Sequence, residues 1–133
     1  MPALLSTLVL DPKLSTVRRA CAILMYLTIL VAGSIPGARA EIGHVASGLV
    51  LHSIAYAVLA FLWFTGSAGS PAVRAAKAVL AVALMGAGDE YVQSFFPYRG
   101  SDVHDWMVDC AAAIVTSAVL YAVMPKSGAP AQR

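Results

Sequence analysis

The sequence predicts an all-α membrane protein, a four-helix transmembrane bundle that forms one domain over residues 1–133. Apolar residues make up 59% of the chain and charged residues only 12%, whereas soluble domains carry about 25% charged residues. The mean hydropathy of +0.77 also excludes a disordered chain, because disorder requires low hydrophobicity. Each helical crossing takes about 20 residues, so this length allows at most about four or five crossings.

The first two predicted spans lie in charge-free runs of the sequence. One run follows Arg19 and contains a continuous apolar string, which predicts a span over about 20–36. The next run follows Glu41 and predicts a span over about 45–64. Glycine, serine and proline residues of 65–71 then indicate a turn.

The third and fourth predicted spans must take carboxylates into their ends. Only 11 uncharged residues precede Asp89 and only 16 follow Asp109, which is about 16 Å and 24 Å of helix. The hydrocarbon core of a bilayer is about 30 Å thick. The spans must therefore cover about 74–96, including Asp89 and Glu90, and about 103–124, including Asp109.

The distribution of lysine and arginine predicts that both termini are cytoplasmic. With an inner N-terminus, the inner segments contain seven basic residues, and the outer segments contain only Arg39 and Arg99. An alternative for the start of the chain is a signal peptide cleaved before Glu41, which leaves the orientation of the other three spans unchanged. Six of the seven acidic residues then lie on the outer side: Glu41, Asp89, Glu90, Asp102, Asp105 and Asp109.

The polar residues of the spans predict an outward-facing site. Ionisable residues inside a membrane usually face a bundle interior or a cavity. His52 lies four residues before Tyr56 on one helix face, and Asp102, Asp105 and Asp109 are spaced i, i+3, i+7 on another. We therefore predict a polar binding site formed by His52, Tyr56, Asp89, Glu90, Gln93, Arg99, Asp105 and Asp109.

A structural interpretation of the same residues remains open. Asp89, Glu90, Arg99 and Asp105 could form only an ion-pair clasp between the third and fourth helices, because structural networks also gather charges. No metal or other cofactor is expected, since no HxxxH or CxxC spacing accompanies His52. Nucleic-acid binding is not expected either, because the chain has no basic patch.

A motif at the end of the third span resembles a known family. The sequence Asp-Glu-Tyr-Val-Gln-Ser-Phe-Phe-Pro-Tyr-Arg, residues 89–99, is followed by Asp105 and Asp109. This string is similar to the acidic pair, Gln, aromatic, Pro, Arg and Asp of the VanZ-like family, small bacterial multi-helix membrane proteins named after a teicoplanin-resistance factor. His52 and Tyr56 match the family's His-xxx-Tyr.

Other positions of the chain both match and depart from the family pattern. Ser34-Ile35-Pro36 matches the Ser-x-Pro after the first span. Gly48 and Leu49 replace an Asp-Lys pair, Asp109 replaces an Asn, and Ala112 replaces a Gly. The resemblance implies an envelope protein of the bacterial cytoplasmic membrane that modulates susceptibility to glycopeptides such as teicoplanin.

Three function classes follow from these residues. The first is a protein whose outer polar site binds a wall precursor, a membrane lipid headgroup or an envelope protein, with a homo-oligomer also compatible with four spans. The alternative is a membrane enzyme acting on an outer-leaflet lipid or wall precursor, with His52 or a carboxylate as general base and Arg99 stabilising charge. A transporter is the third, although the inner halves of the spans offer no continuous polar path.

Overall fold

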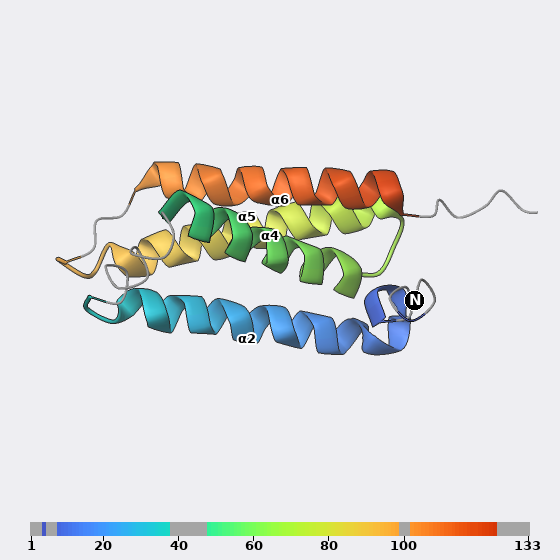
Figure 1. The fold of residues 1–133 in the computed structure, drawn as a ribbon, viewed down its shortest axis with the longest axis horizontal. Helices are drawn as coiled ribbons and strands as arrows, with labels where there is room; N and C mark the ends of the chain where they lie inside the picture. Colours follow the sequence, from blue (N-terminus) through green and yellow to red (C-terminus); the bar gives the residue numbers. More distant parts are fainter. Residues whose placement is uncertain (1–3, 5–7, 38–47, 99–101, 125–133) are drawn as a thin grey trace, which may run out of the picture.

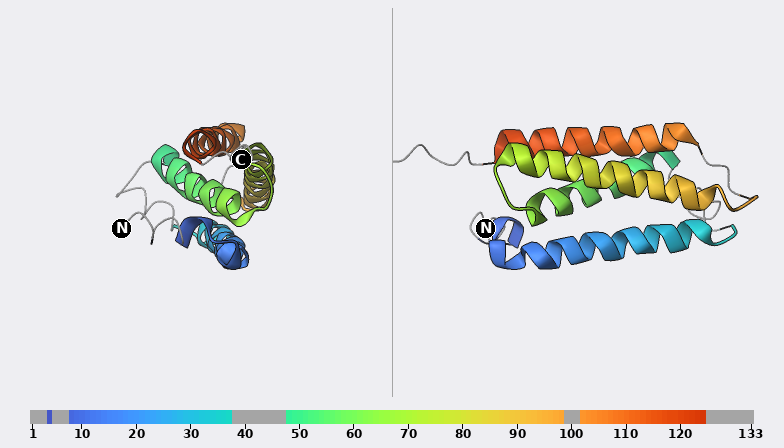
Figure 2. Two further views of the ribbon diagram at one scale, coloured as in Figure 1. Left: turned by 90° about the vertical axis from the view of Figure 1, so that its right-hand side faces the viewer. Right: turned by 180° about the vertical axis from the view of Figure 1, so that it is seen from behind.

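The computed structural model describes residues 4, 8–37, 48–98 and 102–124, which contain helices and turns but no strand (Figure 1). Four long helices follow one short 3₁₀ helix, and consecutive long helices run in opposite directions (Figures 1 and 2). The elements in chain order are η1 (Pro12–Leu14), α2 (Ser15–Ser34), α4 (Gly48–Gly66), α5 (Pro71–Gln93) and α6 (Val103–Val123).

All four long helices have the length and composition of membrane spans. The shortest, α4, has 19 residues, or about 28 Å of helix against about 30 Å of hydrocarbon. Large apolar side chains cover the outside of every helix, where lipid can solvate them. Examples that expose 60% to 65% of their surface are Leu24, Ile54, Leu84 and Val115. The prediction of an all-α, four-span membrane protein is confirmed.

The helices α4 and α5 pack against each other in the middle of the bundle. Helix α6 contacts both of them on one side, and α2 contacts both on the other (Figure 2). The start of α2 and the end of α6 lie at one end of the bundle, which we call the terminal end (Figure 1). At the other end, called the polar end, α2 and α5 finish and α4 and α6 begin. The cytoplasmic position of the terminal end stays a prediction from the charge distribution.

Two helices begin before the membrane spans that the sequence predicts. Helix α2 begins at Ser15 rather than near residue 20, because the Arg18 side chain is hydrogen-bonded inside the bundle and does not need to stay in water. Helix α5 begins at Pro71 rather than at residue 74. Proline suits the first turn of a helix, and the Ser70 hydroxyl accepts a hydrogen bond from Val73 N at 3.3 Å, capping that turn.

The other described helix boundaries lie within three residues of the predicted span ends. Helix α5 ends at Gln93, three residues before the predicted end at residue 96. Helix α6 begins at Val103 as predicted, with Asp102 as its N-cap. The predicted start of the second span at residues 45–47 lies outside the described residues.

Arg18 joins α2 to α4 at the terminal end. Only 7% of this residue is exposed, and its guanidinium donates hydrogen bonds to the carbonyl oxygens of Leu8 and Asp11 at 2.8 Å and of Thr65 at 2.9 Å. Gly66 lets the end of α4 approach the start of α2 closely, because a Cβ there would lie 3.1 Å from the Ser15 carbonyl oxygen. The first span is therefore fastened to the second by a buried charge.

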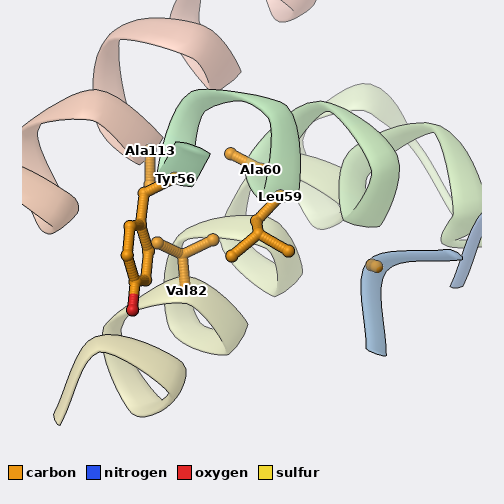
Figure 3. Close-up of a cluster of buried hydrophobic side chains, with 6 residues drawn as sticks. Tyr56, Leu59, Ala60, Val82 and Ala113 are labelled. Atoms are coloured by element: carbon orange, nitrogen blue, oxygen red, sulfur yellow. The ribbon is translucent and has the colours of Figure 1, made fainter. Parts of the chain in front are cut away.

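The apolar core combines alanines with larger side chains from all four helices (Figure 3). Small residues let helix backbones approach closely, which is how membrane helices gain packing energy. Ala113 and Ser117 are both buried at i, i+4 on α6, whereas Ala118 and Ala122 face outward. The buried members of the core cluster are Ala22, Tyr56, Leu59, Ala60, Val82 and Ala113.

Candidate functional site

A buried histidine–carboxylate pair joins α4 to α6 near the polar end. The ring N–H at His52 Nδ1 donates to Asp109 Oδ1 at 2.7 Å, and His52 Nε2 lies 4.0 Å from Asp105 Oδ2. The Asp109 side chain is fully buried. Gly86 on α5 provides its space, because a Cβ there would lie 3.0 Å from Asp109 Oδ2. The carboxylate therefore fixes the orientation of the imidazole from inside the bundle.

A second polar pair joins α4 to α5 one helical turn further from the start of α4. The Tyr56 hydroxyl donates to Asp89 Oδ2 at 3.2 Å, and both side chains are buried. The rings of His52 and Tyr56 are stacked, with centroids 5.8 Å apart and planes 4° from parallel. Tyr26 of α2 lies beside this pair, since a Cβ on Gly88 would come 2.5 Å from its hydroxyl.

Glu90 has a different environment from its neighbour Asp89. Its Oε2 atom accepts a hydrogen bond of 2.7 Å from the backbone N–H of Asp102, the residue that caps α6. Glu90 thus links the end of α5 to the N-cap residue of α6. Arg99, the cation of the predicted clasp, lies outside the described residues.

A cavity of about 200 Å³ lies between α2, α4 and α5 at the polar end. Its walls are mostly apolar, and its polar lining comes from four of the predicted site residues: His52, Tyr56, Asp89 and Gln93. The predicted residues Glu90, Asp105 and Asp109 do not line it. The remaining lining residues are Ile29, Ala32 and Gly33 of α2 with Gly48, Leu51 and Ala55 of α4.

Sequence reasoning missed the contribution of α2 to this site. Ile29, Ala32 and Gly33 are apolar or small residues in an apolar span, so nothing in the sequence distinguishes them from residues that face lipid. Tyr26 did carry a signal, because it is a hydroxyl-bearing residue within the predicted first span. Its position beside Gly88 shows that α2 brings a polar group to the α5 side of the site.

Within the part of the chain that the structure describes, three buried acceptor atoms in this region have no hydrogen-bond partner: Asp109 Oδ2, Glu90 Oε1 and Gln93 Oε1. Their residues expose 0%, 8% and 2% of their surface. A buried acceptor without a donor lowers the stability of a fold by about 1–3 kcal/mol. A molecule that donates hydrogen bonds to these atoms would recover part of that free energy. Among the described residues, no group of three or more His, Cys, Asp or Glu side chains is arranged to hold a metal ion.

The sequence model of a family described as VanZ/LLP1 matches residues 20–124 of the chain. The chain belongs to the VanZ/LLP1 family. The match extends from the second turn of α2 to the residue after α6 and thus includes part or all of every span. No curated protein and no solved structure matches the chain.

In this VanZ/LLP1 protein, the acidic pair of the motif is divided between two environments. Consecutive helix residues point about 100° apart, so Asp89 lines the cavity while Glu90 holds the α5–α6 connection. Gln93 lies about one turn beyond both and lines the cavity. The end of α5 therefore contributes side chains to the cavity wall and also holds the N-cap residue of α6.

Proposed function

We propose that this VanZ/LLP1 protein is an envelope protein of the bacterial cytoplasmic membrane whose cavity binds the headgroup of an outer-leaflet lipid or lipid-linked wall precursor. The observation that carries the proposal is the cavity, with apolar walls and four convergent polar side chains. Ligand sites in proteins typically combine an apolar lining with a few placed polar groups.

The depth of the polar side chains supports a headgroup ligand. His52 lies four residues after the first described residue of α4, or about 6 Å along the helix, and Gln93 is the last residue of α5. Both positions are near one end of the spans, where headgroups meet hydrocarbon. The excess of basic residues at the terminal end favours placing the polar end outside, where wall precursors are polymerised.

A role in teicoplanin susceptibility follows from the same proposal. Glycopeptides bind wall precursors outside the cell, so a protein that holds such a precursor or its surrounding lipid changes the access of the drug. Deleting the protein is expected to raise teicoplanin susceptibility, and wild-type protein is expected to restore the original level. A double variant, Asp89→Leu with Gln93→Leu, is expected to fail, because it removes two polar groups from the cavity wall.

The matched control for this experiment is His104→Ala, whose side chain is 81% exposed at the same end of the bundle. Like the wild-type protein, this variant is expected to return teicoplanin susceptibility to its original, lower level. Membrane levels of each variant are measured by quantitative blotting. Restoration by the double variant at equal abundance would show that the cavity is not the functional site.

A membrane enzyme is a second candidate, and the His52–Asp109 pair is the observation that favours it. A buried carboxylate that orients an imidazole through one ring nitrogen leaves the other nitrogen available for proton transfer. The purified protein would be incubated with lipid-linked wall precursors, and products would be measured by mass spectrometry. Turnover that is lost in His52→Gln supports this candidate, and absence of turnover in wild type favours the binding protein.

A further inference from the structure

One polar atom on the cavity wall, Gln93 Oε1, is a buried acceptor without a donor among the described residues. We infer that the cavity accepts a primary ammonium group on a short stem, which rests on the proposed headgroup-binding function and names the chemistry of the ligand. Gln93 is the first observation: its residue is 98% removed from solvent, its Oε1 atom has no partner among residues 4, 8–37, 48–98 and 102–124, and it lines the cavity.

The charges around the cavity favour a cation. Asp89 lies on the wall and uses Oδ2 to accept the Tyr56 hydrogen bond. Behind the His52 ring are the carboxylates of Asp105 and Asp109. Among the described residues, no lysine or arginine lines the cavity, and His52 is the one basic side chain on its wall. Clefts lined by one sign of charge in a low-dielectric setting concentrate ions of the other sign.

The hydrogen-bonding pattern favours a primary ammonium group over other cations. Such a group offers three N–H donors and no acceptor, which suits the Gln93 Oε1 atom and the Asp89 carboxylate. A quaternary ammonium group has no N–H to donate, and it could use only the stacked faces of His52 and Tyr56. Hydrogen bonds to charged groups are stronger than neutral ones. We therefore expect the cavity to bind a primary ammonium headgroup more tightly than a quaternary one.

The size of the cavity limits the ligand to a short stem. An engineered cavity of about 150 Å³ holds a benzene molecule, and this cavity measures about 200 Å³. An ammonium group with a few carbon atoms fits, and the carbon atoms would contact Ile29, Leu51 and Ala55. Acyl chains must remain outside, in the bilayer.

Two envelope molecules carry this chemistry. One is an aminoethyl phospholipid, phosphatidylethanolamine, and the other is a lipid-linked wall precursor with a free side-chain amine on its peptide. The full chain, purified in detergent, would be titrated with phosphatidylethanolamine, phosphatidylcholine and phosphatidylglycerol, and retained lipid measured by native mass spectrometry. A second arm uses the precursor with its amine free or acetylated.

Phosphatidylethanolamine, or the free-amine precursor, is expected to bind about tenfold more tightly than its methylated or acetylated counterpart, which corresponds to one charge-assisted hydrogen bond. Whichever of phosphatidylethanolamine and the free-amine precursor binds more tightly is the envelope molecule that supplies the ammonium group. Gln93→Leu is expected to remove the preference, and His104→Ala is expected to keep it. Ala32→Phe fills the cavity while leaving every polar group in place, and it should remove the preference even if Gln93→Leu fails to fold.

The outcomes separate this inference from the function on which it rests. Equal binding of phosphatidylethanolamine and phosphatidylcholine, together with equal binding of both precursor forms, would overturn the ammonium inference and leave headgroup binding intact. Retention of none of these lipids would overturn both. A preference for the primary amine that survives in Ala32→Phe would also overturn the inference, because the amine would then bind elsewhere.

Discussion

Replacing His52 with leucine is expected to destabilise the bundle by about 3–5 kcal/mol, which is the usual cost of leaving a buried charge without its partner. The substitution leaves Asp109 fully buried without the 2.7 Å hydrogen bond to the imidazole. Its other oxygen, Oδ2, already lacks a partner. The measurement is the free energy of unfolding in detergent micelles, obtained by denaturant titration followed by circular dichroism.

A second substitution tests whether the uncompensated carboxylate is the cause. Asp109→Asn in the His52→Leu background is expected to recover more than about half of the loss, because a neutral amide is far less costly to bury than a charge. The matched control is His104→Leu, which breaks an equally short His–Asp contact of 2.8 Å at an exposed site. That control should change stability by less than about 1 kcal/mol, and an equal loss in the control would contradict the explanation.

Replacing Arg18 with methionine is expected to be the other large effect, with a loss of roughly 3 kcal/mol or more. The guanidinium donates to three backbone carbonyls, and that of Thr65 belongs to α4. Methionine keeps much of the apolar volume of the side chain and removes every donor. The same unfolding titration measures the loss, and limited proteolysis tests whether α2 separates from the bundle first.

The neighbouring Arg19 provides the matched control, because it is exposed on the same helix turn. Arg19→Met is expected to be nearly neutral, and Arg18→Lys is expected to lie between wild type and Arg18→Met, since an ammonium group is smaller than the guanidinium fork. If Arg18→Met and Arg19→Met have equal stability, the buried hydrogen bonds do not fasten α2 to α4.

The number and type of helices could be predicted from the sequence because they depend on backbone length. A span has to cross a fixed thickness, so the short charge-free runs required Asp89 and Asp109 to lie inside helices. Both residues do lie within α5 and α6, and both are buried. The pairing of His52 and Tyr56 on one face of α4 follows from the same helical geometry.

Tertiary burial could not be predicted from the same patterns. The regular spacing of Asp102, Asp105 and Asp109 predicted one acidic stripe, but Asp102 has an extended backbone as the N-cap and is not part of the helix. The charge count that predicts the orientation includes Arg18 but does not show that Arg18 is buried against carbonyls. A sequence pattern specifies positions on one helix and not the backbone groups that neighbouring segments bring.

The imidazole of His52 belongs to both halves of the polar region. One side of the ring lines the space enclosed by α2, α4 and α5, while Nδ1 holds the carboxylate on α6, which is not among the lining residues. The imidazole ring would therefore separate a ligand in that cavity from the Asp109 carboxylate. A ligand that tilts the imidazole would change its hydrogen bond to Asp109 and so alter the contact between α4 and α6.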